Sequence, residues 1–374
     1  MTCAEPWTTR VRNTTASDRT ARSHREHLLS LAEPRLRQWR DILARKSESR
    51  NCSYSRLRKT GKSFPVIISV ILCTYNRAHG LGSALESVLA SALPSHIDWE
   101  LLVVDNNSRD CTHEVINEFC LRHPRRVRYI FEAQQGLSNA RNAGIREARG
   151  EILAFVDDDV TVEPTWLDNL TAGLRDGQWA GSGGRILPPQ GFSPPPWLAL
   201  QGPWGQGGVL CAQFDMGDTA GELKDEPPYG TNMAFRKEIF ERYGVFRTDL
   251  GHCGDGLIGN DDTEFGRRLM ARGERLRYEP LAVVYHSVPA ERLNKRYFRA
   301  WWFAFGRAQI REKGPRTKVW GIPRFYFSLP NIALRFFLPQ IVRSILARDP
   351  HERFRRQCLA CCMAGNMAEI WNLR

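Results

Sequence analysis

Three consecutive carboxylates, Asp157, Asp158 and Asp159, end the apolar run that begins at Ile152. Like charges at adjacent positions repel one another, so the triplet needs solvent or a cation to offset its charge. Hard divalent cations take carboxylate oxygens as ligands. The triplet therefore indicates either a solvated acidic turn or a divalent-cation site, and the rest of the chain has to decide between them.

Three further apolar runs precede the triplet, and most of them also end in polar residues. They read PVIISVILCTYN, WELLVVDNNS and RVRYIFEAQQG, and each is followed by a helical pattern. Strands that alternate with helices of about 10–15 residues predict βαβ units and a parallel sheet. Ligands of such sheets bind at the carboxyl ends of the strands. We therefore expect the residues after these runs to meet at one site.

The second half of the chain is less regular. Pro- and Gly-rich sequence follows Arg185, and its Trp197 and Trp204 are suited either to stacking on a ligand or to anchoring the loop. A helix is predicted from Thr263 to Ala271, and LRYEPLAVVYHSVP is predicted as a strand pair. We expect a main α/β domain at residues 63–292, between a basic, partly helical extension at 1–62 and an amphipathic helical region at 293–374.

Size and charge narrow the class of protein. The chain has 374 residues and a formal net charge of +12, which favours phosphorylated ligands or a polyanionic surface. Its ten cysteines are scattered, which indicates reduced thiols in a reducing compartment. The first 30 residues lack the apolar core of a signal peptide, and no apolar stretch reaches spanning length. The sequence thus predicts a cytoplasmic protein.

The C-terminal region raises the question of a membrane. FYFSLPNIALRFFLPQIVRSILARDP is apolar, but it contains Arg335 and Arg343 and is interrupted by Pro330 and Pro339. This composition favours a helix that lies in the membrane interface on the cytoplasmic face. A helical cap packed on the catalytic domain is the alternative, and both stay open because an apolar helix face does not reveal its partner.

The motifs, taken in order, resemble family 2 glycosyltransferases of the GT-A fold. The resemblance runs from about Pro65 to about Leu293, through VILCTYNR, LLVVDNNSRD, GLSNARNAGIREARGEILAFVDDDV, GTNMAFRKEIF, NDDTEFGRRLMARG and YEPLAVVYHSVPAERL. Each motif alone is weakly specific, and the ordered set is highly specific. The resemblance implies an α/β fold of the Rossmann-like GT-A type, with a mostly parallel sheet flanked by helices and a C-terminal helical region.

By this resemblance, the triplet holds Mn²⁺ or Mg²⁺ beneath the diphosphate of a nucleotide sugar. Asp159 is the expected direct ligand, and Asp157 bonds the ribose or reaches the metal through water. Asp158 is assigned to the donor nucleotide site with less certain placement. His286, at the end of LAVVYH, either completes the metal site or is a histidine bonded at a strand end.

The resemblance also assigns residues to the donor nucleotide. Asp105 accepts a hydrogen bond from the base, and Arg141 matches an arginine of the nucleotide pocket. The first loop packs the base and contacts ribose and phosphate, through Thr74, Tyr75, Asn76 and Arg77. A capped turn is the alternative for this loop when it is considered alone.

On the acceptor side, the resemblance makes Asp262 the general base that takes the proton of the attacking hydroxyl. Asp261 stands where the family usually has Glu, which puts the reach of that side chain in doubt. Both acids also suit a helix N-terminus, and the two roles are compatible. Beside the donor sugar the resemblance places Gly230, Thr231 and Asn232.

The predicted activity is a metal-dependent, inverting transfer of a hexose-type sugar. The donor is a UDP-, GDP- or dTDP-sugar, the acceptor is a glycan or a lipid-linked molecule, and no nucleic acid is involved. One alternative is a nucleotidyltransferase of similar fold, but CTYNRAHGLGS lacks the Gly-rich basic loop of that class. The other is a non-catalytic basic module on membrane or nucleic acid, which needs no clustered carboxylates.

Overall fold

The computed structural model describes residues 67–254, 256–314, 318–319, 322–323 and 325–372. The extension at residues 1–62, with its predicted helix, lies outside these residues. The predicted boundaries at 62/63 and 292/293 remain a prediction.

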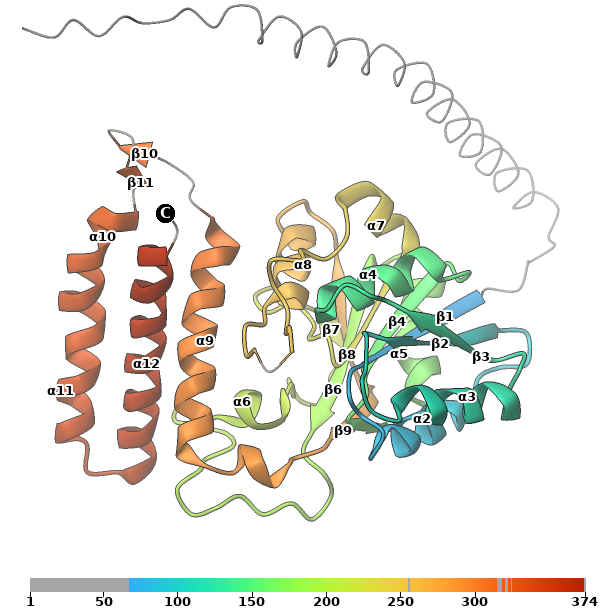
Figure 1. Cartoon of the computed structure of the whole chain (residues 1–374), viewed down its shortest axis with the longest axis horizontal. Coiled ribbons are helices and arrows are strands. Elements are labelled where there is room, and N and C mark those ends of the chain that lie inside the picture. Colours follow the sequence, from blue (N-terminus) through green and yellow to red (C-terminus); the bar gives the residue numbers. More distant parts are fainter. Residues whose placement is uncertain (1–66, 255, 315–317, 320–321, 324, 373–374) are drawn as a thin grey trace, which may run out of the picture. The chain divides into compact units, whose positions relative to one another are not determined.

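The first half of the described chain alternates strands and helices (Figure 1). In order, these elements are β1 (Ile67–Thr74), α2 (Leu81–Leu89), β2 (Asp98–Asp105), α3 (Thr112–Arg122), β3 (Val127–Phe131), α4 (Leu137–Glu147) and β4 (Ile152–Asp157). β2 and β4 flank β1 in parallel, and β3 is parallel to β2. The β-branched runs are buried on both faces because helices cover the sheet. The predicted βαβ arrangement is confirmed.

The second half extends the same sheet with strands of mixed direction. Its elements are β5 (Val160–Val162), α5 (Trp166–Arg175), β6 (Gly181–Leu187), α6 (Gly207–Cys211), β7 (Gly221–Glu222), β8 (Asn232–Arg236), α7 (Lys237–Tyr243), α8 (Asp261–Met270) and β9 (Leu276–His286). The strand order is β3-β2-β1-β4-β8-β6-β9-β5, with β7 on β9. β8 is antiparallel to both β4 and β6, whereas β9 is parallel to β6.

The predicted strand pair at LRYEPLAVVYHSVP is wrong, since its first eleven residues form the single strand β9. β9 pairs with β6 along its length, with a shift of register between Gly184 and Arg185. Gly184 faces Glu279 and Arg185 faces Val283, so Pro280 lies in the skipped stretch. Proline lacks the N–H that a ladder needs, and a bulge accommodates it without ending the strand.

Helix α4 lies unusually close to the sheet, because a Cβ on Gly144 would be 2.5 Å from Cγ2 of Ile71. A glycine at this position therefore lets the helix pack against β1. Three phenylalanines, Phe240, Phe246 and Phe265, pack against one another and against Phe155 of β4. This apolar cluster joins α7 and α8 to the sheet.

The chain ends in a group of helices beside the sheet (Figure 1). They are η1 (Ala290–Arg292), α9 (Lys295–Lys313), α10 (Phe325–Ile332), the π-helical turn η2 (Ala333–Phe337), α11 (Leu338–Leu346) and α12 (Pro350–Asn372), with β10 (Lys318–Val319) and β11 (Ile322–Pro323) after α9. α9 and α12 make close contact at two glycines. A Cβ added to Gly306 of α9 would lie 2.0 Å from a backbone oxygen of α12, and a Cβ added to Gly365 of α12 would lie 2.0 Å from a backbone oxygen of α9. No helix in the described part of the chain has both the length and the apolar character needed to cross a membrane.

Trp197 joins the irregular loop to these helices. Its ring packs edge-on against Phe298 of α9 and Phe354 of α12, with centroid distances of 5.5 and 5.2 Å. Of the two roles considered for this tryptophan, the structure places it as an anchor of the loop. Trp204 stacks under the guanidinium of Arg356 at 5.0 Å.

Candidate active site

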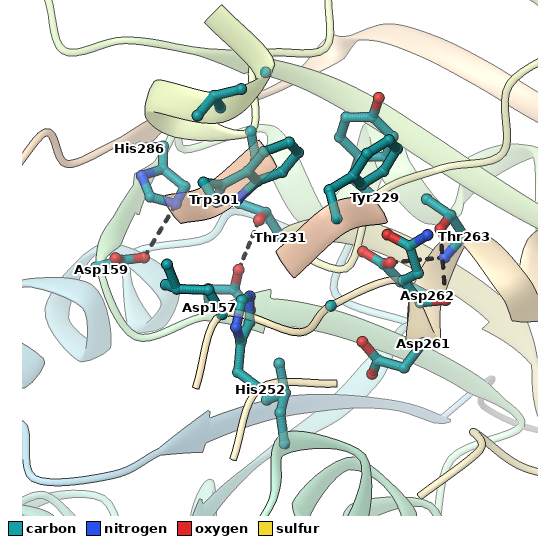
Figure 2. Close-up of a pocket in the computed structure, with 18 of the residues that line it drawn as sticks. Asp157, Asp159, Tyr229, Thr231, His252, Asp261, Asp262, Thr263, His286 and Trp301 are labelled. Carbon is teal, nitrogen blue, oxygen red and sulfur yellow. Dashed lines mark hydrogen bonds and ion pairs between the residues drawn. The ribbon is translucent and has the colours of Figure 1, made fainter. Parts of the chain in front are cut away.

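The carboxyl ends of the central strands border a cavity of about 950 Å³. It is lined from the ends of β1, β4 and β9, the start of α8 and one face of α9 (Figure 2). Of the residues predicted from the sequence, it is lined by Thr74, Tyr75, Arg77, Arg141, Asp157, Asp158, Asp159, Thr231, Asp261, Asp262 and His286. Residues expected to contact the donor, the metal and the acceptor therefore share one hollow.

Asp157, Asp159 and His286 form a compact cluster in this cavity. One ligand atom of each lies within 4.8 Å of the others. β5 follows the triplet and pairs antiparallel with β9, with Val160 opposite His286, and this pairing brings the imidazole to the carboxylates. His286 Nε2 is 3.4 Å from Asp159 Oδ1, while Nδ1 is 2.7 Å from the Ser287 carbonyl oxygen. A proton on Nδ1 would satisfy that carbonyl and leave the Nε2 lone pair facing Asp159.

The middle carboxylate, Asp158, has partners of its own. The Thr74 hydroxyl donates to its Oδ2 at 2.6 Å, and Arg77 Nε lies 3.3 Å from Oδ1. Burial, and then the charge of Asp159, raise the pKa of Asp158 to about 7 although Arg77 and Thr74 oppose the shift. Arg77 also reaches Asp159, at 2.8 Å. The first loop thus offsets part of the repulsion within the triplet.

Arg141 of α4 lies between the two ends of the site and is only 4% exposed. Its Nη1 is 2.7 Å from Asp261 Oδ2, and its Nη2 is 3.4 Å from Asp157 Oδ1. Burial disfavours its charge, but the carboxylates of Asp261 and Asp157 raise its pKa above the ordinary value. The guanidinium therefore links the acidic triplet to the start of α8.

Asp262 lies in the first turn of α8. Its Oδ2 accepts from the backbone N–H of Gly230, and its Oδ1 accepts from the backbone N–H of Thr263, each at 2.6 Å. Figure 2 shows Asp262 beside Thr263. Burial, and then the neighbouring charge of Asp261, raise the pKa of Asp262, against the effects of Arg141 and the two N–H groups. Gly230 itself is tightly enclosed, because a Cβ there would be 2.1 Å from Nη2 of Arg141.

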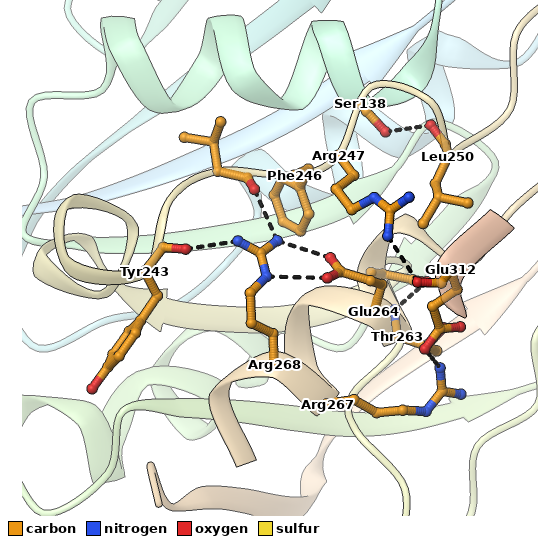
Figure 3. Close-up of polar contacts among 12 residues, drawn as sticks. Ser138, Tyr243, Phe246, Arg247, Leu250, Thr263, Glu264, Arg267, Arg268 and Glu312 are labelled. Carbon is orange, nitrogen blue, oxygen red and sulfur yellow. Dashed lines mark hydrogen bonds and ion pairs between the residues drawn. The ribbon is translucent and has the colours of Figure 1, made fainter. Parts of the chain in front are cut away.

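Arginines hold α8 in place (Figure 3). Arg268 pairs with Glu264 at 2.8 Å and donates to the carbonyl oxygens of Tyr243 and Val245. Arg267 pairs with Glu312 near the end of α9 at 2.7 Å. These contacts fix the helix that positions Asp261 and Asp262.

Four predicted residues do not line the cavity: Asn76, Asp105, Gly230 and Asn232. The carboxylate of Asp105 accepts from the Ser108 N–H and from the Tyr129 hydroxyl, at 3.0 and 3.2 Å. Asn232 is fully buried, and its side chain accepts from the indole N–H of Trp166 at 2.8 Å. Asn76 has a φ of 50° and accepts from the N–H of Arg109, as expected of a turn residue. Their contacts with a ligand remain predictions.

The sequence analysis missed one wall of the cavity. Residues of η1, α9 and α12 line it alongside the predicted ones, namely Arg292, Tyr297, Trp301, Trp302, Phe305 and Arg355. Arg292 lies 3.6 Å from Asp159. The i, i+4 spacing of the aromatic residues from Tyr297 to Phe305 could have revealed a shared helix face, but it does not show what that face contacts.

Known proteins give the fold and the site a context. Residues 69–244 match the family described as Glycosyl transferase family 2. The chain is also similar to curated glycosyltransferases. It is 28% identical over 289 residues to Glycosyltransferase AglE of Haloferax volcanii, which covers 73% of this chain and 82% of that protein. Glucosyl-dolichyl phosphate glucuronosyltransferase of the same organism is 26% identical over 246 residues, or 64% of this chain and 76% of that protein.

A solved structure shows the same fold. Mannosyltransferase PcManGT from Pyrobaculum calidifontis, in complex with GDP-Man and Mn²⁺, superposes with a TM-score of 0.57 at 20% identity, over 86% of this chain and 94% of that one. The match over residues 69–244 agrees with the predicted resemblance, and the predicted GT-A-like α/β fold is confirmed. These similarities support a glycosyltransferase.

Proposed function

We propose that this glycosyltransferase moves a sugar from a nucleotide diphosphate donor to a glycan or lipid-linked acceptor, with Mn²⁺ or Mg²⁺ as cofactor and with inversion at the anomeric carbon. The observation that carries the proposal is the presence of the Asp157–Asp159–His286 cluster and of Asp262 in one cavity. A departing diphosphate needs positive charge, and an attacking hydroxyl needs a base. The cavity offers residues for both.

The cluster fits a divalent cation. Two carboxylates and an imidazole are ligands that Mn²⁺ accepts, and their atoms are close enough for one ion to touch all three. The bond between His286 Nδ1 and the Ser287 carbonyl oxygen is the outer contact that commonly orients a metal-binding histidine. Asp157, Asp159 and His286 would hold the ion, which supplies positive charge for a diphosphate.

Arginines on both sides of Asp159 support diphosphate binding by the chain itself. Arg77 Nη2 and Arg292 Nη2 lie 2.8 and 3.6 Å from the same carboxylate oxygen. Guanidinium groups form strong, directional hydrogen bonds with phosphate oxygens. A UDP-, GDP- or dTDP-sugar would place its diphosphate here, with Thr74 and Tyr75 toward the nucleoside.

Asp262 is the proposed general base. The two N–H groups on its oxygens orient the carboxylate, and the helix N-terminus is a favourable place for a negative charge. Burial raises its pKa, which makes it a stronger base than an ordinary aspartate. It would accept the proton of the acceptor hydroxyl while that oxygen attacks the anomeric carbon from the side opposite the diphosphate.

Exposed apolar side chains on η2 and α11 support peripheral contact with a membrane. Leu334, Val342, Ile345 and Leu346 are 53–73% exposed. Arg335 and Arg343 belong to the same segment, so apolar and cationic groups are presented together. α12 meanwhile packs on α9. In this proposal α12 is the cap and α11 is the membrane-facing element.

Calorimetric titration of GDP and UDP with and without Mn²⁺ tests the function. Binding of one nucleotide by the wild type should require Mn²⁺, and Asp159→Asn should weaken it at least about tenfold because a ligand charge is lost. Asp225→Asn, an exposed acid of the same cavity outside the cluster, is the matched control. Nucleotide affinity that ignores both Mn²⁺ and Asp159→Asn would refute metal-dependent donor binding.

A further inference from the structure

The wall that α9 and α12 add to the cavity is aromatic. Trp301 and Phe305 stack with their ring centroids 5.1 Å apart and an interplanar angle of 11°. Trp302 meets both rings edge-on, and its indole N–H donates to Gln206 at 3.0 Å. The bond to Gln206, itself only 4% exposed, fixes the orientation of the Trp302 ring.

Arg355 of α12 covers that ring and lines the same cavity. Its Cζ is 4.1 Å from the ring centroid of Trp302. Among the residues that the structure describes, its buried Nη1 has no hydrogen-bond partner. Burial, and then the charge of Arg356, lower the pKa of Arg355, and the groups that act against this are the thiols of Cys358 and Cys362 rather than carboxylates.

Neighbouring arginines are paired in the usual way. Arg307 and Arg311 of α9 both bind Glu369, and Arg356 binds Glu352. A buried guanidinium nitrogen without a hydrogen-bond acceptor, such as Nη1 of Arg355, costs free energy, so a protein rarely keeps one without a use. Stacking on Trp302 occupies the face of the guanidinium and leaves its N–H groups, at the edge, for an anion.

We propose that Arg355 and the aromatic wall form an acceptor subsite for a phosphate-bearing molecule, in which Arg355 binds a phosphate or diphosphate oxygen and Trp301 and Phe305 pack against the adjoining group. The inference rests on the proposed function, and it names the chemical class of the acceptor. A cavity of about 950 Å³ lies near the upper end of small-ligand sites, which leaves room for a second ligand beside the donor.

Arg355 lies on a different element from the residues assigned to the donor. Those residues come from β1 and its loop, β4, β9 and η1, whereas Arg355 is on the last helix. Asp225 and Glu226 also line the cavity, but both are exposed and neither pairs with Arg355 in the described structure. The subsite therefore keeps a positive charge available to a ligand.

Binding by the full chain to three probes tests the subsite. Farnesyl phosphate represents a lipid phosphate, glucose 1-phosphate a soluble one, and farnesol the lipid without the anion. The variants are Arg355→Gln, the charge-retaining Arg355→Lys, and Arg356→Gln as matched control on the same helix. Affinities are measured by calorimetry, together with GDP and UDP binding in Mn²⁺ and the melting temperature of each variant.

We expect the wild type to bind a phosphate probe more tightly than farnesol, and Arg355→Gln to weaken that binding about 10- to 100-fold, the range of a charge-assisted hydrogen bond. Arg355→Lys should retain part of the affinity, and Arg356→Gln all of it. The melting temperature of Arg355→Gln should not fall, because the side chain has no ion pair with the described residues to lose. The better of the two phosphate probes identifies a lipid or a soluble source.

Equal affinity for farnesol and farnesyl phosphate, or unchanged phosphate binding in Arg355→Gln, would overturn the subsite. Weakened binding of GDP and UDP in Arg355→Gln would assign the arginine to the donor and overturn it as well. A third outcome separates the two proposals. If phosphate binding depends on Arg355 but the wild type binds no nucleotide with Mn²⁺, the proposed function is refuted and the anion subsite is supported.

Discussion

Replacing Gly230 by alanine tests how Arg141 joins the acidic triplet to the start of α8. The new Cβ would lie 2.1 Å from Nη2 and 2.7 Å from Cζ of Arg141, well inside van der Waals contact. The guanidinium is the far end of a flexible side chain, but it is held between Asp261 and Asp157. Any movement that relieves the clash therefore breaks or lengthens these ion pairs.

The size of the effect follows from burial. The side chains of Arg141 and Asp261 are only 4% and 3% exposed, so separating them leaves buried charge uncompensated. Breaking such a pair costs about 3–5 kcal/mol. At the lower figure, a folding unit of about 300 residues should melt about 5 °C lower.

Thermal unfolding of the wild type and Gly230→Ala measures this loss. Gly82→Ala in α2 is the matched control, because its Cβ meets nothing within 4 Å, and it should be neutral or slightly stabilising. In an Arg141→Met background, Gly230→Ala should cost much less, since the clashing atoms are gone. An unchanged melting temperature in Gly230→Ala, or an equal loss in both backgrounds, would refute the reasoning.

Four further outcomes are expected. Asp262→Asn should lower the rate of sugar transfer about 10²- to 10⁴-fold and leave nucleotide affinity unchanged. The rate is measured by the release of nucleoside diphosphate. Burial raises the pKa of Asp262, and a general base acts only when it is deprotonated. The wild-type rate should therefore fall with decreasing pH, with an apparent pKa above the ordinary aspartate value. A fall with an apparent pKa at or below that value would argue against Asp262 as the base. Glu369→Gln should lower the free energy of unfolding by about 2 kcal/mol in urea titrations, because two arginines of α9 lose their carboxylate, whereas an unchanged midpoint would show that the pairs are screened. Ile345→Asp should reduce co-sedimentation with anionic vesicles, whereas Leu121→Asp, at an exposed position of α3, should not. Equal co-sedimentation of the two variants would show that α11 does not contact the membrane.

Local pattern was enough to predict the first half of the fold. Apolar runs such as Ile152–Asp157 alternate with helical segments, and the right-handed parallel crossover leaves few ways to arrange them. The polar residues that end these runs then meet at one edge of the sheet. This geometry explains why Thr74, Arg77 and the triplet were found together by sequence alone.

Pattern failed where pairing partners come from distant parts of the chain. The segment of β9 was predicted as a strand pair, but its pairing with β6 continues on both sides of the bulge that contains Pro280. The sequence also did not predict that the side chain of Asn232 bonds inside the core to Trp166 and to two carbonyl oxygens, and its place beside the sugar remains a prediction. Neither partner is a neighbour in sequence, so no local signal reports the contact.

For this protein, residue type and order were enough to predict the family resemblance, the sheet and the acidic edge, since these follow from periodicity and from motifs within single segments. Only the tertiary structure decided which partner each carboxylate has. Thr74 and Arg77 contact Asp158, Arg141 pairs with both Asp157 and Asp261, and His286 lies beside Asp159. It also placed Arg355 against Trp302, with its Nη1 lacking a partner among the described residues. Such pairings depend on distances of a few ångströms between segments far apart in the chain, and a sequence does not specify these distances until the whole core has packed.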